Sequence, residues 1–128
     1  MKILIAEDDH VSRVLLESLL SGWGYNVASA HDGAEALRLW KEMPDLSLAV
    51  LDWILPKIDG LGVCREIRKE IDRPAYIVML TSRVEHKELL TAFARGVDDY
   101  VTKPFIPAEL RVRIKSGERI VSLDRELR

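Results

Sequence analysis

Three acidic residues in a row, Glu7, Asp8 and Asp9, follow a short apolar segment near the start of the chain. Two carboxylates about 4 Å apart repel each other by roughly 4 kcal/mol at an effective dielectric constant near 20. A cluster of this kind must spread its charges into water, take up protons or bind a cation. The three acids are therefore candidate ligands of a metal ion.

Three further polar residues, Asp52, Thr81 and Lys103, also follow apolar segments. Taken singly, each has an ordinary structural explanation. Asp52 could be a turn acid after a buried strand, Thr81 could cap a helix, and a lysine before a proline is usually solvated. Tyr100 is in the same way typical of a packed aromatic residue whose hydroxyl reaches water. Their joint occurrence at the ends of apolar segments indicates a shared site.

These side chains match the requirements of phosphoryl transfer to a carboxylate. Asp52 is a candidate nucleophile that would attack a phosphoryl group and become an acyl phosphate. Because an anion would attack an anion, a divalent cation held by neighbouring carboxylates is needed to offset the repulsion. Magnesium suits an all-oxygen site with few protein ligands. Lys103 would give the phosphate a positive charge and Thr81 a hydrogen bond.

Short apolar segments alternate with amphipathic ones, and this pattern predicts the elements that position the polar residues. The predicted strands are Lys2–Ala6, Asn26–Ala30, Leu46–Leu51, Ala75–Leu80 and Asp98–Thr102. The predicted helices are His10–Ser21, Gly33–Met43, Gly60–Lys69, Glu85–Arg95 and a last one from Pro107 to the end. Apolar residues recur at helical spacing in the first and fourth helices, at Val14, Leu15, Leu19, Leu20, Leu89, Leu90 and Phe93.

The near-continuous apolar character of the first, third and fourth strands favours a parallel sheet with helices on both faces. In such a sheet the ligand site lies beyond the carboxyl ends of the strands. The acids at 7–9, Asp52, Thr81 and Lys103 follow four different strands, so we expect them to meet at one edge of the sheet.

Composition narrows the class of protein. A chain of 128 residues, 48% hydrophobic and 31% charged, is typical of one globular domain. The net charge of −2 gives no support to binding of nucleic acid or membranes by bulk charge. No apolar run approaches the roughly 20 residues that span a bilayer, and the apolar N-terminal run is too short for a signal peptide. Cys64 is the only cysteine, which fits a reducing cytoplasm.

Four motifs in this order and spacing resemble the receiver domain of bacterial two-component response regulators. They are "ILIAEDD" at the first strand, "LAVLDWILPKIDG" around Asp52, "VMLTS" at the fourth strand and "GVDDYVTKPF" at the fifth. The resemblance covers nearly the whole chain. It implies a flavodoxin-like, doubly wound α/β fold whose five-stranded parallel sheet has the strand order 2-1-3-4-5.

The resemblance also implies a role for each site residue. Asp52 matches the phosphoacceptor, which receives its phosphoryl group from a sensor histidine kinase or a phosphotransfer protein. Asp8 matches the acid that binds Mg²⁺ directly and Glu7 the acid that acts through a metal-bound water, with Asp52 and the backbone carbonyl of Ile54 completing the metal site. Thr81 and Lys103 match the switch hydroxyl and the phosphate-pairing lysine.

Other positions have family counterparts too. Tyr100 matches the aromatic residue that rotates in the switch, and the resemblance implies a cis bond between Lys103 and Pro104. Asp9 is a third acid beyond the matched pair, and we assign it to helix capping or to support of the other acids. Ile54 and Arg83 occupy positions that tune the lifetime of the acyl phosphate in the family.

Two alternative functions remain open at this point. An aspartyl-phosphate phosphohydrolase needs the same groups, but its nucleophile usually lies in a D-x-D pair at the first strand, where this chain has Glu7-Asp8-Asp9. A degenerate receiver used only as a binding module would lack one of the site residues, whereas all are present here. We therefore expect a phosphoacceptor that catalyses only its own phosphorylation and dephosphorylation, not an independent enzyme.

The C-terminal segment predicts a helical extension that leads out of the domain. We expect a receiver domain over residues 1–117 and an extension of the last helix over 118–128, leading to an output domain beyond Arg128. Ile120, Leu123 and Leu127 have the spacing of a coiled-coil seam, which predicts a phosphorylation-dependent homodimer. The alternative is a frayed amphipathic helix end, since the segment covers fewer than two heptads and follows Gly117. The segment weakly resembles those that precede diguanylate cyclase domains. A DNA-binding output is the runner-up, with no direct nucleic-acid or membrane contact by the receiver itself.

Overall fold

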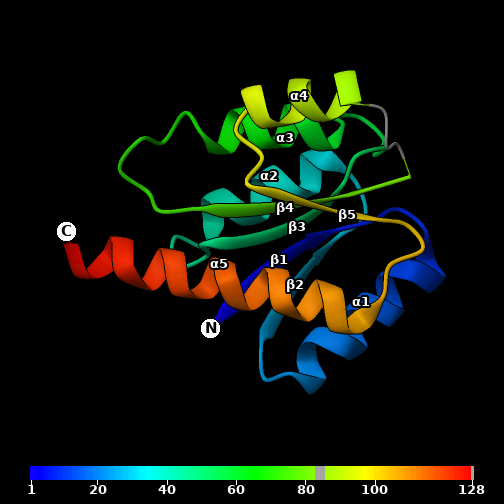
Figure 1. The fold of residues 1–128 in the computed structure, drawn as a ribbon, viewed down its shortest axis with the longest axis horizontal. Helices are drawn as coiled ribbons and strands as arrows, with labels where there is room; N and C mark the ends of the chain where they lie inside the picture. The colour runs from blue at the N-terminus through cyan, green and yellow to red at the C-terminus, as the bar shows by residue number, and fades with distance from the viewer. Residues whose placement is uncertain (83–85, 128) are drawn as a thin grey trace.

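The computed structural model describes residues 1–82 and 86–127, which form five parallel strands and five helices in strict alternation (Figure 1). The sheet order is β2-β1-β3-β4-β5, as predicted. The elements are β1 (Lys2–Ala6), α1 (His10–Gly22), β2 (Asn26–Ala30), α2 (Gly33–Glu42), β3 (Leu48–Asp52), α3 (Gly60–Ile67), β4 (Tyr76–Thr81), α4 (His86–Ala94), β5 (Asp99–Thr102) and α5 (Pro107–Leu127).

Helices cover both faces of the sheet, with α1 and α5 on one side and α2, α3 and α4 on the other (Figure 1). Alternate residues of each strand point to opposite faces, so Ile3 and Ile5 join the core under α1 and α5 while Leu4 and Ala6 join the other core. This double coverage is why the central strands are apolar at consecutive positions. No helix in the described part of the chain is long and apolar enough to cross a membrane.

The sequence predicted every element, and the differences lie at the boundaries. β3 and β4 are shifted by one or two residues toward the C-terminus and thus end on Asp52 and Thr81 themselves. Two residues named in the sequence analysis, Arg83 and Glu85, lie outside the described residues. The last predicted helix is observed as one continuous helix from Pro107 to Leu127.

Aspartates begin three of the helices. The side chains of Asp9, Asp32 and Asp59 accept hydrogen bonds from backbone N–H groups three residues further on, at 2.9, 2.7 and 2.8 Å. Each bond satisfies one of the N–H groups that a helix N-terminus leaves without a partner. The capping role expected of Asp9 is therefore confirmed.

The buried face of α1 differs from the one that the apolar spacing indicated. Leu16 and Leu20 are fully buried, whereas Val14 and Leu15 are about half exposed, at 46% and 50%. Leu16 and Leu20 pack in the core that α1 and α5 share with the sheet. The exposed residues leave an apolar row on the outer surface of α1.

Gly117 has a packing role that the sequence did not reveal. It is buried in the middle of α5, and a Cβ added there would lie 2.4 Å from Cδ1 of Tyr76 on β4. A glycine in a helix interior normally costs about 1 kcal/mol relative to alanine. Here the missing side chain allows α5 to lie directly against the ring of Tyr76.

We predict that Gly117→Ala lowers the free energy of unfolding by about 1–3 kcal/mol, because the new methyl group overpacks the contact with Tyr76. The matched control is Ser116→Ala on the same helix, which should leave stability unchanged or slightly higher because alanine favours a helix. Urea denaturation followed by circular dichroism measures both variants. A Gly117→Ala protein more stable than the wild type would show that helix propensity outweighs the contact.

Candidate functional site

The ends of four strands bring the predicted polar residues to one edge of the sheet. Glu7 follows β1, Asp52 ends β3, Thr81 ends β4 and Lys103 follows β5. Glu7, Asp52 and Thr81 are buried, with exposed fractions of 1%, 7% and 1%. Two buried carboxylates and a hydroxyl thus lie where parallel α/β sheets place their ligand sites.

Lys103 connects the two buried carboxylates. Its Nζ donates to Oε1 of Glu7 at 2.6 Å and to Oδ2 of Asp52 at 2.7 Å. The bond between Lys103 and Pro104 is cis, as expected. The side chain of the lysine is 27% exposed, so the ammonium group is largely shielded from solvent. The three residues form one ion-pair network at the sheet edge.

The pKa values reflect this network. Burial raises the pKa of the Glu7 carboxyl, the nearby Asp52 raises it further, and Lys103 opposes the rise without cancelling it. Burial lowers the pKa of the Lys103 ammonium, but its hydrogen bonds to Asp52 and Glu7 and their charges outweigh burial, so that this pKa lies above its ordinary value. The lysine therefore stays protonated at neutral pH.

The remaining predicted metal-site residues lie at the rim. Asp8 is exposed, beside the buried Glu7. Ile54 is 59% exposed, and its backbone N–H donates to Oδ1 of Asp52 at 3.4 Å. The structure thus places one direct ligand candidate, Asp8, at the surface above the buried pair.

Arg13 contributes to the site in a way that the sequence analysis missed. Its Nη1 donates to the backbone carbonyls of Glu7 and Asp8, at 2.9 and 3.3 Å, from the second turn of α1. The guanidinium group thereby fixes the loop that carries the acids. The only signal for this role was the short spacing between Arg13 and the acids, because a residue one helical turn beyond the N-cap can reach back to that loop.

The two predicted switch residues lie on neighbouring strands. Thr81 is buried at the end of β4, and its carbonyl accepts a hydrogen bond from the backbone N–H of Lys103 at 2.9 Å. Tyr100 on β5 is partly buried, and its ring meets that of Phe93 on α4 edge to face, with centroids 6.1 Å apart. The site is thus connected through β4 and β5 to the surface near α4.

The chemistry of the donor atoms fits magnesium. Glu7, Asp8 and Asp52 offer carboxylate oxygens and Ile54 a carbonyl oxygen, the ligands that this hard cation prefers. Within residues 1–82 and 86–127, however, no three His, Cys, Asp or Glu side chains are gathered closely enough to hold a metal ion by themselves. The geometry accounts for this, because the Lys103 ammonium lies between the two buried carboxylates and Asp8 lies at the surface.

We predict that Lys103→Met lowers the metal-free free energy of unfolding by about 1–3 kcal/mol at neutral pH, because two buried carboxylates lose their common counter-charge. Lys69→Met is the control, since Lys69 makes an exposed pair with Glu66 and should change stability by less than about 0.5 kcal/mol. Urea denaturation in the presence of a chelator gives both values. Equal effects of the two substitutions would mean that the Lys103 network does not stabilise the fold.

Comparison with known proteins gives the family of the chain. A family model described as the response regulator receiver domain matches residues 3–115. The chain is 49% identical over 121 residues to "Probable transcriptional regulator ycf27" of Porphyridium aerugineum, covering 94% of this chain and 49% of that relative. It is 40% identical over 117 residues to the phosphate regulon transcriptional regulatory protein PhoB of Rhizobium meliloti, covering 90% and 51%.

The chain spans about half the length of the curated relatives it matches. Among solved structures, a chain of the CheX-CheY-BeF3-Mg²⁺ complex from Borrelia burgdorferi is similar, with a TM-score of 0.83 and 25% sequence identity over 91% of this chain and 87% of that one. The fold, the strand order and the match over residues 3–115 agree. The chain therefore belongs to the family of response regulator receiver domains.

Proposed function

We propose that this domain is a phosphorylation-activated signalling switch in which Asp52 accepts a phosphoryl group from a sensor histidine kinase or a phosphotransfer protein. The observation that carries the proposal is the buried Asp52 carboxylate at the end of β3, held at 2.7 Å from the Lys103 ammonium. A carboxylate nucleophile beside a fixed cation is what acyl-phosphate formation requires.

In this mechanism a carboxylate oxygen of Asp52 attacks the phosphorus of a phosphohistidine, the P–O bond forms, and the P–N bond to the donor breaks. The Lys103 ammonium offsets the negative charge of the phosphoryl oxygens, and its raised pKa keeps it charged during the reaction. The Thr81 hydroxyl would bind a phosphoryl oxygen, since Thr81 ends β4, the strand beside the one that ends at Asp52. The domain acts only on itself, by its own phosphorylation and dephosphorylation.

Glu7, Asp8, Asp52 and the backbone carbonyl of Ile54 are the residues that would hold Mg²⁺. The cation would supply the charge neutralisation that lets the Asp52 carboxylate approach an anionic phosphoryl group. Arg13 holds the acid loop in place from α1. The similar structure from Borrelia burgdorferi is named as a complex with Mg²⁺, which supports magnesium as the cation.

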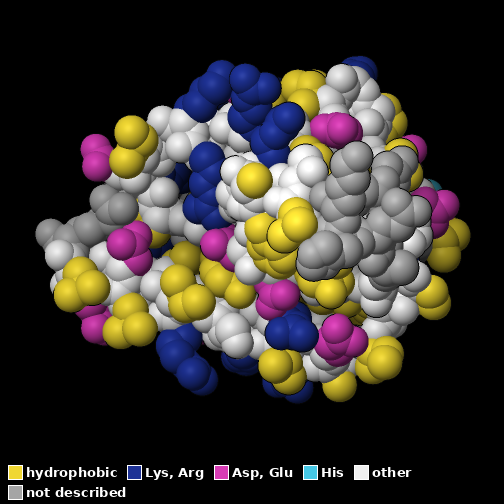
Figure 2. All heavy atoms as spheres, turned by 45° about the horizontal axis from the view of Figure 1, so that its top comes forward, with side chains coloured by type: hydrophobic (Ala, Val, Ile, Leu, Met, Phe, Trp, Pro, Cys, Tyr) yellow, Lys and Arg dark blue, Asp and Glu magenta, His cyan; other side chains and the backbone are white. Residues whose placement is uncertain are grey.

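The switch would act on the face formed by α4, β5 and α5. Thr81 would be drawn toward the phosphoryl group and Tyr100 would turn inward, which shifts the population between two existing conformations. Figure 2 shows hydrophobic side chains on the exposed surface, with acidic and basic ones among them, and Leu90 and Phe93 of α4 are 56% and 43% exposed. An exposed apolar surface of this kind is suited to a partner.

The partner that supplies the phosphoryl group would dock beside the site. Leu15 of α1 and Phe105 line a cavity of about 370 Å³ that also includes Lys103. Val11 and Ile106 are exposed, at 74% and 63%. An apolar surface next to the nucleophile would allow a kinase helix to bring its phosphohistidine to Asp52.

The proposal also includes a cytoplasmic location for the domain.

The output beyond this domain is proposed to be transcriptional. The relatives are named as transcriptional regulators, and this chain matches about half of their length. Two similar solved structures are named as response regulator/GGDEF domain proteins, but at 22% identity they show the fold alone. The relatives at 40–49% identity therefore favour the DNA-binding alternative over the diguanylate cyclase, and neither the phosphohydrolase nor the degenerate receiver gains support. Val121 within the 118–128 segment is buried against the domain, while Ile120, Leu123 and Leu127 are exposed and could pair in a homodimer.

We predict that Asp52→Asn abolishes phosphorylation by acetyl phosphate and magnesium, because an amide is a poor nucleophile. Intact-mass spectrometry should show one added phosphoryl group on the wild type and none on the variant. The control is Asp9→Asn, which keeps a capping side chain and should still be phosphorylated. A phosphoryl adduct on Asp52→Asn would place the acceptor elsewhere.

We predict that Asp8→Asn weakens magnesium binding by about tenfold or more, since the affinity of an oxygen site depends on its number of ligand charges. Because Asp8 is exposed, the substitution should leave metal-free stability nearly unchanged. Titration with magnesium, followed by tryptophan fluorescence and by amide chemical shifts, measures the affinity. Unaltered affinity in Asp8→Asn, with Asp9→Asn as the matched control, would remove Asp8 from the metal site.

We predict that beryllofluoride with magnesium shifts the amide resonances of α4, β5 and α5, because it mimics the phosphoryl group on Asp52. Thr81→Ala should reduce these shifts while leaving those next to Asp52. The Asp52→Asn protein is the control and should not respond. Shifts confined to the strand ends in the wild type would contradict transmission to this face.

A further inference from the structure

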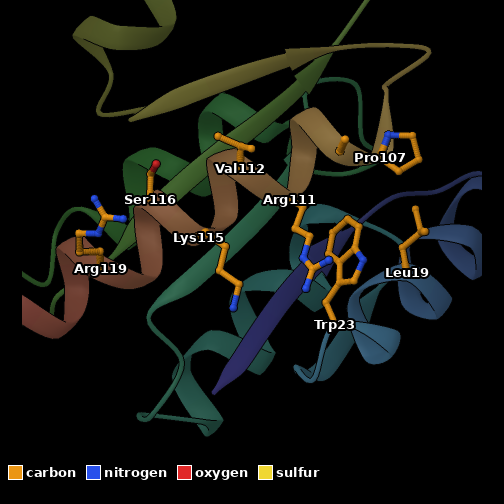
Figure 3. Close-up of a pocket in the computed structure, with 9 residues that line it drawn as sticks. Leu19, Trp23, Pro107, Arg111, Val112, Lys115, Ser116 and Arg119 are labelled. Carbon is orange, nitrogen blue, oxygen red and sulfur yellow. The ribbon is translucent and has the colours of Figure 1, made fainter.

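A groove between the end of α1 and the outer side of α5 has no part in the proposed phosphorylation site (Figure 3). Its volume is about 570 Å³, and it opens broadly to solvent. The end of α1 and the first two turns of α5 supply the apolar lining, at Leu19, Trp23, Pro107, Ala108 and Val112. An exposed apolar groove between two helices is a surface on which a further helix can pack.

Three cations form one wall of the groove. Arg111, Lys115 and Arg119 follow one another at four-residue steps on α5 and are all exposed. Figure 3 shows the guanidinium group of Arg111 over the indole of Trp23, 5.6 Å from the ring centroid. None of the nine residues that line the groove is acidic. The groove therefore combines an apolar floor with a row of positive charge.

We propose that this groove is the docking site for an acidic amphipathic helix of a partner protein. Cations four residues apart on α5 are spaced by about 6 Å along the helix axis, so the three span about 12 Å. Carboxylates at four-residue steps on a second helix have the same spacing, and the apolar side of that helix would cover Leu19, Trp23 and Val112. Charge complementarity thus selects the partner.

Other occupants fit the groove less well. A two-fold contact between two copies of this chain, centred on the groove, would bring the same three cations of both copies together. A small anion would engage one or two of the cations and leave the apolar lining exposed. A nucleic acid could meet the charges, but the largely apolar lining favours the apolar side of a protein helix.

The test uses the ¹⁵N-labelled 128-residue chain and a synthetic 18-residue helical peptide with leucines along one side and glutamates at every fourth position. The peptide should shift the amides of Leu19, Trp23 and residues 108–119. A second peptide with lysines in place of the glutamates should bind at least about tenfold more weakly, because its charges repel those of the groove.

Charge reversal supplies the matched comparison. The double variant Lys115→Glu/Arg119→Glu should lose about tenfold in affinity for the acidic peptide and should gain affinity for the lysine peptide. Lys41→Glu/Lys69→Glu makes the same change in net charge on α2 and at the end of α3, on the other side of the sheet, and should bind as the wild type does. Circular dichroism confirms that these exposed substitutions leave the fold intact.

Several results would overturn the proposal. These are no groove shifts at millimolar acidic peptide, shifts centred on another face, or equal binding of the two peptides. Groove shifts that depend on protein concentration alone would identify a second copy as the occupant. Stronger perturbation of the same amides by a single-stranded oligonucleotide or by ATP than by the acidic peptide would identify a nucleic acid or a small anion instead.

Discussion

The ammonium group of Lys103, held between the carboxylates of Glu7 and Asp52, is the interaction on which the site depends. Burying two carboxylates costs desolvation free energy and adds their mutual repulsion, which a cation at hydrogen-bonding distance offsets. The two acids lie at the ends of the adjacent strands β1 and β3, whereas the lysine follows the edge strand β5. The network therefore requires β1, β3 and β5 to end at the same level of the sheet.

The parallel register meets this requirement. Ala6 pairs with Leu51, Asp52 with Leu80 and Thr81 with Thr102, so the residues that end the strands form a continuous line across the sheet. The same register joins the site to the rest of the domain, because Lys103 donates its backbone N–H to the carbonyl of Thr81. These backbone bonds connect the end of β3 through β4 to Lys103 after β5.

The sequence predicted the fold and the site edge well because both depend on local patterns. Alternating apolar and amphipathic segments marked the elements, and polar residues at strand ends marked the edge where Glu7, Asp52 and Lys103 meet. Contacts between distant residues were not predictable. The low helix propensity of Gly117 indicates only a less stable helix at that position. Its closeness to Tyr76 depends on how α5 crosses β4. Arg13 was missed because its partners are backbone carbonyls, which every residue carries, so that its short spacing from the acids was the one signal.

Helix α5 contributes both to the core and to the exposed surface of the domain. Its inner side is fixed to the sheet by Leu110, Ile114 and the close contact of Gly117 with Tyr76. Its outer side carries the basic wall of the groove, and its last turns carry the exposed apolar residues Ile120 and Leu123. Because these surfaces belong to one continuous helix, a displacement of α5 at the switch face would move the groove and the C-terminal apolar residues together. If the proposed phosphorylation at Asp52 also shifts α5, a partner that prefers one position of α5 would in turn bias the proposed phosphorylation site, since coupling between two sites is reciprocal.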